Sequence, residues 1–219
     1  MTEAKKNIGS EQPKTLRVIA NILSYILHPV FMPTVMTFVL YKLAPVSFAG
    51  VTFEQFKMWM ISVGVTTLFF PLFTILLLKG LGFAKSFHME TTRERIVPLM
   101  ATMVFYFWAS HVFNNITSPL ILKVLLLGSF WGIIVLFMIN IFVKVSLHTA
   151  AAGGMIGILL VLMMTSPVNM VLPFFVALII AGLMGTIRLI LKAHTPAEVW
   201  LGYIVGILVQ LGAYWYMKP

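Results

Sequence analysis

The sequence predicts an all-α fold, a polytopic transmembrane helical bundle of about six to seven spans. Of the 219 residues, 60% are hydrophobic and only 10% are charged, well below the roughly 25% charged residues of soluble domains. A soluble domain of this length cannot bury so much apolar surface. Apolar runs near the roughly 20 residues that cross a bilayer recur along most of the chain.

Seven of these apolar runs are the candidate spans, and short polar connections join them. The first run contains His28, Pro29 and Pro33, so we expect a kink there. The third and fifth runs are short, which suggests that they begin in the interface or are half-buried. The runs are 18–41, 58–78, 97–113, 120–143, 149–164, 171–191 and 199–217.

Two glycine pairs have the spacing that lets helix backbones approach closely in lipid. Gly153 and Gly157 lie on the fifth run, and Gly202 and Gly206 lie on the seventh. The alternative is that these pairs only reflect how common glycine is in membrane helices.

The chain divides into a polar N-terminal tail, residues 1–16, and a single membrane domain, residues 17–219. The tail lacks the short apolar core and small-residue cleavage site of a cleaved signal peptide. We therefore expect the first span to remain in the mature protein. No repeat, low-complexity tract or linker interrupts the rest.

The charge balance narrows the chemistry. The chain has 15 Lys and Arg against six acidic residues, a net charge of +9, and it has no Cys and no Asp. The missing Cys excludes disulfides and thiol nucleophiles, and so few carboxylates argue against Asp-rich magnesium chemistry. A chain this apolar is a poor candidate for nucleic acid, so the basic excess indicates the anionic membrane surface or an anionic substrate.

Counting spans places three polar clusters on one face of the membrane. The clusters are the Lys85–Arg95 stretch, Ser146 to His148, and Arg188 to Glu198. Ionisable groups near membrane depth are candidates for function. The opposite face carries little that is reactive.

The last cluster contains a helix start. Thr195 fits the N-cap, Pro196 the first helical position and Glu198 the third, which is a capping box. Helix capping alone can explain Glu198. The same geometry brings Glu198 near His194, where a carboxylate can hold one imidazole nitrogen and leave the other free to attack.

The other two clusters suit phosphate binding, although each has a plain alternative. Ser146 and His148 precede the fifth span, where a helix N-terminus offers free N–H groups to an oxyanion. Alone, they are also a typical N-cap and an interfacial histidine. Lys85, Arg93 and Arg95 could form a solvated positive loop, but Arg also suits bidentate phosphate contacts. Together the clusters indicate phosphoryl transfer through a phosphohistidine, which needs no metal or other cofactor.

These residues resemble a known family. Arg188-x5-His194-x3-Glu198 resembles the third signature of the type 2 phosphatidic acid phosphatase superfamily, Ser-Arg-x5-His-x3-Asp. Ser146-Leu147-His148 resembles its second signature, Pro-Ser-Gly-His. The stretch from Lys85 to Pro98 stands where the first signature, Lys-x6-Arg-Pro, is expected. The likeness covers about residues 80–207.

The resemblance implies a membrane lipid phosphatase that hydrolyses a lipid phosphomonoester or pyrophosphate in a cell membrane. His194 would be the nucleophile, Glu198 would orient it, and His148 would protonate the leaving oxygen. The phosphate would be held by Arg188, Arg95 and the backbone around Ser146, with Arg93 and Lys85 as further first-signature candidates.

The sequence also departs from the family pattern. Thr186-Ile187 precede Arg188 where the family has Ser, Leu147 replaces Gly, and Glu198 replaces Asp. Lys85-x7-Arg93 is one residue too long, and Arg95 is separated from Pro98 by two residues. Two alternatives therefore stand beside hydrolysis: a phosphotransferase on the same fold, or a catalytically inactive phospholipid-binding or transport protein.

Overall fold

A computed structural model describes residues 12–81 and 95–218. Within that part of the chain the fold is all-α, and seven helical segments are long and apolar enough to cross a membrane. The predicted class is confirmed, and the chain is a multi-pass helical membrane protein. The segments are Lys14–Leu43, Phe53–Gly80, Ile96–Asn115, Leu120–Asn140, Leu147–Thr165, Val171–Ile190 and Pro196–Met217.

The expected shortness of the third and fifth spans is wrong. They have 20 and 19 residues, both long enough to span. The apolar runs underestimated them because the polar pair Asn114 and Asn115, and the turn that starts at Leu147, continue the helices.

The first span is broken where the prolines predict. Helix α1 (Lys14–Ile26) ends before His28, a 3-10 turn η1 (Pro29–Phe31) follows, and α2 (Met32–Leu43) continues the crossing. Proline removes a backbone donor and cannot continue the preceding helix. The Nδ1 atom of His28 accepts a 3.4 Å hydrogen bond from the Val30 N–H, which caps the break. The predicted kink is confirmed.

The second span carries a π turn that the sequence analysis did not expect. Helix α3 (Phe53–Gly64) passes into η2 (Val65–Phe69) and then α4 (Phe70–Gly80), with Pro71 in the first turn of α4. Because Pro71 has no N–H to donate, the hydrogen-bond ladder shifts there.

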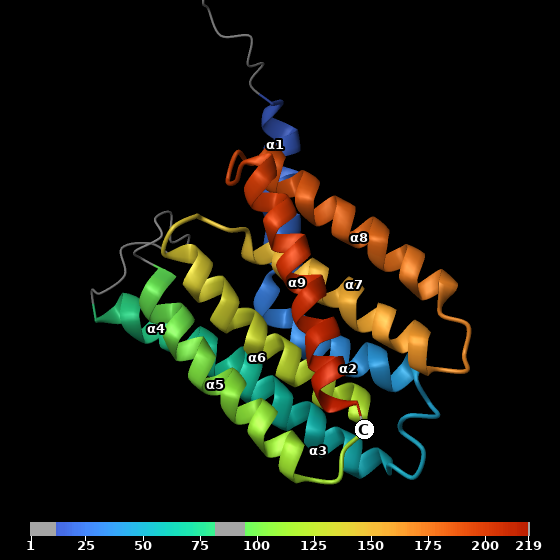
Figure 1. Ribbon diagram of the computed structural model, residues 1–219. Coiled ribbons are helices and arrows are strands. Elements are labelled where there is room, and N and C mark those ends of the chain that lie inside the picture. The colour runs from blue at the N-terminus through green and yellow to red at the C-terminus, as the bar shows by residue number, and fades with distance from the viewer. Residues whose placement is uncertain (1–11, 82–94, 219) are drawn as a thin grey trace, which may run out of the picture.

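The remaining helices are α5 (Ile96–Asn115), α6 (Leu120–Asn140), α7 (Leu147–Thr165), α8 (Val171–Ile190) and α9 (Pro196–Met217). Among the described spans, α7 is the most enclosed. Figure 1 shows α9 crossing in front of α7, with α8 on one side and α5 and α6 on the other.

The glycine pairs lie where α7 and α9 nearly touch, so the close-packing prediction is confirmed. A Cβ atom added at Gly206 would overlap the carbonyl oxygen of Ala150, and one at Gly202 would overlap the Thr149 hydroxyl. A Cβ at Gly153 would overlap the backbone of Tyr203. This contact fixes the start of α7 against the start of α9, the two helix ends that carry the candidate histidines.

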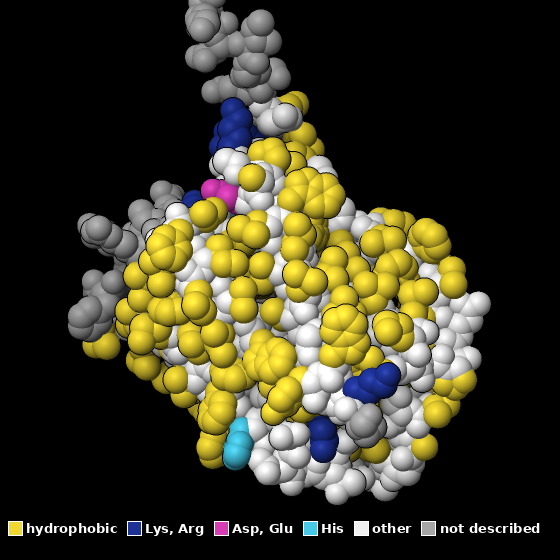
Figure 2. Space-filling model, in the orientation of Figure 1, with side chains coloured by type: hydrophobic (Ala, Val, Ile, Leu, Met, Phe, Trp, Pro, Cys, Tyr) yellow, Lys and Arg dark blue, Asp and Glu magenta, His cyan; other side chains and the backbone are white. Residues whose placement is uncertain are grey.

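The two ends of the bundle differ. Figure 2 shows hydrophobic side chains over the middle of the visible surface and charged side chains gathered toward its ends. In Figure 1, the starts of α1 and α9 and the end of α8 lie at the upper end. The turns 44–52, 116–119 and 166–170 lie away from it. The candidate residues at the end of α8 and the start of α9 therefore lie at the upper end, as the span count predicts.

Candidate functional site

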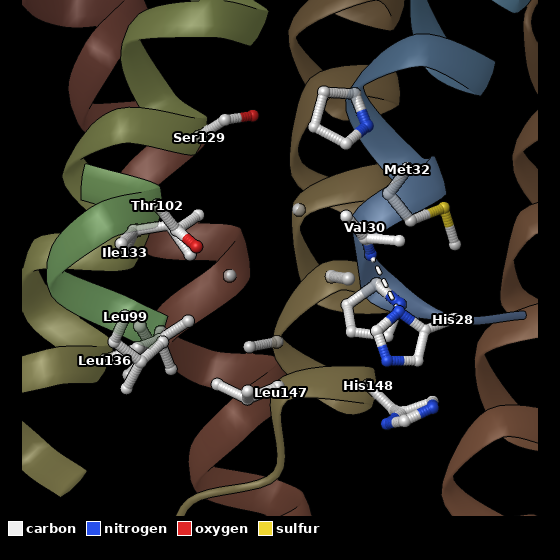
Figure 3. A pocket seen from close by; sticks show the side chains of 18 of the residues that line it. His28, Val30, Met32, Leu99, Thr102, Ser129, Ile133, Leu136, Leu147 and His148 are labelled. Atoms are coloured by element: carbon white, nitrogen blue, oxygen red, sulfur yellow. Dashed lines mark hydrogen bonds between the residues drawn. The ribbon is translucent and has the colours of Figure 1, made fainter. Parts of the chain in front are cut away.

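A cavity of about 790 Å³ lies among the helices and joins two kinds of surface. One part is lined by Arg95, Arg188, His148 and His194, and another by apolar side chains of α2, α5, α6, α7 and α9. Figure 3 shows His28 and His148 on one side and Leu99, Ile133 and Leu136 on the other. The cavity thus combines cationic and imidazole groups with an apolar interior.

His194 and Glu198 meet as the capping-box spacing predicts. Glu198 Oε2 accepts hydrogen bonds from the Thr195 N–H (3.1 Å) and from His194 Nδ1 (3.0 Å). His194 Nδ1 also lies 3.0 Å from the carbonyl oxygen of Lys144. Because a carbonyl can only accept, Nδ1 must carry the hydrogen, and in the neutral ring Nε2 keeps its lone pair. Nε2 is therefore the atom with nucleophilic character.

Burial keeps this imidazole neutral. Desolvation lowers the pKa of His194 to about 4; the hydrogen bond to Glu198 opposes the shift, and the charges of Arg188 and Arg95 add to it. At neutral pH the ring therefore carries no proton on Nε2. A histidine held in this form is suited to attack an electrophile.

The turn that presents His194 has unusual backbone geometry. Lys192 has a φ of 50°, in the left-handed region that non-glycine residues seldom adopt. The Lys192 N–H donates to the Leu189 carbonyl (3.0 Å), and the Ala193 N–H donates to the Arg188 carbonyl (3.1 Å). These bonds end α8 in a tight turn and keep His194 near Arg188.

Two arginines line the same cavity from different helices. Arg188 Nη1 donates to the Ser24 hydroxyl (2.8 Å), while its Nε is buried without a hydrogen-bond partner in residues 12–81 and 95–218. Arg95 Nη1 donates to the Val145 carbonyl (3.2 Å), and burial lowers the pKa of Arg95. Two guanidinium groups on one cavity repel each other, so an anion bound between them would be stabilising. Arg93 and Lys85, the other predicted phosphate ligands, lie outside the described residues.

Ser146 is not among the residues that line the cavity, and its part in holding a phosphate stays a prediction. It is fully buried, and its hydroxyl accepts a bond from the Thr149 N–H (3.4 Å) as the N-cap of α7. The backbone N–H of Ser146 donates to the Glu198 carbonyl (3.3 Å). The hydroxyl is used to start α7 and tie it to α9, whereas the next two residues, Leu147 and His148, line the cavity.

His148 faces helix α1. Its Nε2 lies 3.1 Å from the Ser24 carbonyl oxygen and 3.3 Å from the Ser24 hydroxyl. Since the carbonyl can only accept, Nε2 carries a hydrogen. The His28 ring packs edge-on against His148 with centroids 5.4 Å apart, as Figure 3 shows.

Helix α1 supplies site residues that the sequence analysis missed. Arg17, Asn21 and Ser24 line the cavity from one face of α1, and His28 lines it from the break that follows this helix. That polar stripe on an otherwise apolar span was the available signal. Ser24 is the most connected of the four, because it contacts both Arg188 and His148.

Comparison of the chain with protein-family models, curated proteins and solved structures gives no match. Within the described residues, no group of three His or Glu side chains lies together in the way that a metal site requires. The cavity geometry and the residues that resemble the phosphatase signatures are therefore the observations that bear on function.

Proposed function

We propose that this protein is a membrane-embedded lipid phosphatase of a cell membrane that works through a phosphohistidine at His194. Its substrate is a lipid phosphomonoester or pyrophosphate. The observation that carries the proposal is a neutral imidazole, with its Nε2 lone pair free, on the same cavity as two arginines and an apolar interior. An amphiphile with an anionic head fits such a cavity.

The arrangement suggests a two-step reaction. His194 Nε2 attacks phosphorus, and the bond from phosphorus to the leaving oxygen breaks. Glu198 and the Lys144 carbonyl stabilise the Nδ1–H as the ring gains positive charge. Water then attacks the phosphohistidine, which releases phosphate and restores His194. Arg188 and Arg95 neutralise the phosphoryl oxygens throughout.

His148 is the proposed acid for the leaving oxygen. It can act only after it carries protons on both ring nitrogens, because a neutral imidazole is too weak an acid for this step. Its Nε2–H must also exchange the Ser24 carbonyl for the leaving oxygen. An alcohol leaving group needs this proton, whereas a phosphate leaving group departs without it.

One observation favours a second candidate, a lipid-phosphate binding or transport protein without catalysis. The His148 Nε2 hydrogen is already bound by the backbone of α1. If α1 never moves from this position, the cavity can hold a phosphomonoester but cannot deliver the proton that its alcohol leaving group needs.

A phosphate-release screen separates the two. Purified protein in EDTA should release phosphate from at least one class among lipid phosphomonoesters and pyrophosphates, and His194→Ala should abolish that release. Binding without release across the whole panel favours the second candidate. Full release by His194→Ala contradicts the mechanism. A labelled donor in the presence of acceptor lipids or sugars shows whether the phosphate passes to water or to an acceptor.

A further inference from the structure

A polar side chain far from His194 faces the apolar part of the cavity, and the proposed chemistry does not use it. Gln210 lies on α9, about 21 Å along the helix from Pro196 at roughly 1.5 Å per residue. It lines the cavity together with Gly128 of α6 and Gly154 of α7. Only 2% of its surface is exposed. A buried amide at this depth needs hydrogen-bond partners.

The orientation of the Gln210 amide follows from its neighbour. Nε2 donates to the Leu125 carbonyl oxygen at 3.4 Å, and because that carbonyl only accepts, the amide nitrogen must face it. Oε1 then lies over Gly128, where any Cβ atom would overlap it. Oε1 is buried and has no hydrogen-bond partner among the residues that the structure describes. The structure thus contains an acceptor beside the cavity that lacks a donor.

Two hydroxyl groups on the cavity wall have no hydrogen left to donate in their present positions. Ser129 donates to the Leu125 carbonyl and Thr102 donates to the Pro98 carbonyl, each at 2.7 Å. With their hydrogens used, both oxygens can only accept further bonds. Figure 3 shows Ser129 and Thr102 on the wall opposite His28 and His148. Gln210, Ser129 and Thr102 therefore offer hydrogen-bond acceptors to a ligand in the cavity.

We infer that the deep part of the cavity binds the apolar chain of an amphiphile that carries a hydroxyl group, whose hydrogen bond Gln210 Oε1 accepts. This inference deepens the proposed function and rests on it, because the phosphate of the same molecule lies at Arg188 and Arg95. The surrounding side chains, among them Met36 and Val209, suit the rest of the chain. A hydroxyl donor satisfies an acceptor that a plain alkyl chain would leave unpaired.

Matched probes test the inference. The probes are alkyl monophosphates of one chain length, either plain or with a single hydroxyl at successive positions along the chain. Binding is measured at equilibrium on full-length protein in the His194→Ala background, so that the probe is not consumed. We compare three proteins: one with Gln210 unchanged, the Gln210→Met variant and the Leu208→Met control. Gln210→Met keeps the length of the side chain without the acceptor, and Leu208 lies on the exposed side of α9.

We expect one hydroxyl position to bind at least about fivefold more tightly than the plain chain. Gln210→Met should abolish this preference, and Leu208→Met should keep it. Equal binding of plain and hydroxylated probes to the protein with Gln210 unchanged overturns the inference, because Oε1 then gains nothing from the hydroxyl of the probe. A preference that survives in folded Gln210→Met also overturns it.

A parallel phosphate-release assay on protein that keeps His194 distinguishes this failure from failure of the proposed function. Phosphate release by the protein with His194 intact, without any hydroxyl preference, supports hydrolysis and removes the inference. A preference for hydroxylated probes without phosphate release supports the inferred hydroxyl site and contradicts the proposed hydrolysis. No binding of either probe contradicts both.

Discussion

One oxygen of Glu198 serves two purposes. Oε2 accepts the Thr195 N–H, which caps α9, and also accepts His194 Nδ1. Glutamine has an oxygen at the same reach, so Glu198→Gln can keep both hydrogen bonds while it removes the negative charge. This substitution therefore separates the helix cap from the electrostatic role.

We predict that Glu198→Gln loses roughly a hundredfold in phosphate release while its thermal stability stays near that of the unchanged protein. Glu198→Asp should keep or raise activity. The measurements are initial rates on the preferred lipid and a melting curve in detergent. Equal activity of the Gln variant would leave Glu198 as a cap only.

The pKa of His194 gives a second test at this scale. Because burial lowers it to about 4, the ring should be neutral and able to attack at every pH above that value. The protonated, inactive form should build up only as the pH falls below about 5, rather than near the 6.5 of a free imidazole. NMR of the labelled histidine ring measures this directly, and titration near 6.5 would contradict the buried, Glu198-held geometry.

Substitution of His148 tests how the rate of phosphate release depends on the leaving group. We predict that His148→Asn slows release from an alkyl monophosphate by roughly a hundredfold or more and slows release from a lipid pyrophosphate far less. Only the alcohol must be protonated as it leaves. Steady-state rates on one substrate of each kind provide the comparison, and equal losses on both would indicate a binding role for His148.

Among the helices, α1 positions two site residues, because its Ser24 is hydrogen-bonded to both Arg188 and His148. Ser24→Ala removes the hydroxyl that accepts from Arg188 Nη1 at 2.8 Å and leaves the backbone contact to His148. A buried charged donor that loses its partner costs about 1–3 kcal/mol. We predict weaker substrate binding, about fivefold or more in KM, with a smaller change in kcat. Ser47→Ala in the turn at the opposite end is the control, and an unchanged KM for Ser24→Ala would contradict the role of α1.

The contact between α7 and α9 sets the distance between their starting residues. Gly206→Ala places a Cβ on the Ala150 carbonyl, whereas the Cβ of Gly212→Ala on the same helix meets Trp131 at an ordinary 3.7 Å. Overpacking of this kind costs about 1–3 kcal/mol. We predict a lower melting temperature and lower activity for Gly206→Ala and little change for Gly212→Ala. Similar melting temperatures would show that the helices can separate freely.

At the scale of the whole molecule, the seven-span bundle was predictable because apolar length alone determines what can cross a bilayer. The meeting of His194 with Glu198 was also predictable, since a capping box fixes local geometry over four residues. Ser24 and His28 were missed because their partners Arg188 and His148 lie far away in the sequence. Gln210 gave no local signal either: whether a lone amide faces lipid, protein or a cavity depends on how α6, α7 and α9 pack.

The bundle also predicts which surfaces share a side of the membrane. The chain has no native Cys, so single cysteines report cleanly. Ala197→Cys at the site end and Ser47→Cys in the turn after α2 should react with a membrane-impermeant reagent from opposite sides. Labelling from the same side would contradict the arrangement of spans.

In the proposed mechanism, His194 carries the phosphoryl group during turnover. The most direct measurement is a rapid quench with a lipid phosphate labelled in its phosphoryl group, followed by peptide mapping. We expect a label on His194 that is stable to alkali and labile to acid, is absent in His194→Ala and accumulates when the second step is slowed. Phosphate release at a normal rate with no label on His194 would show that the reaction does not pass through a phosphohistidine at this residue.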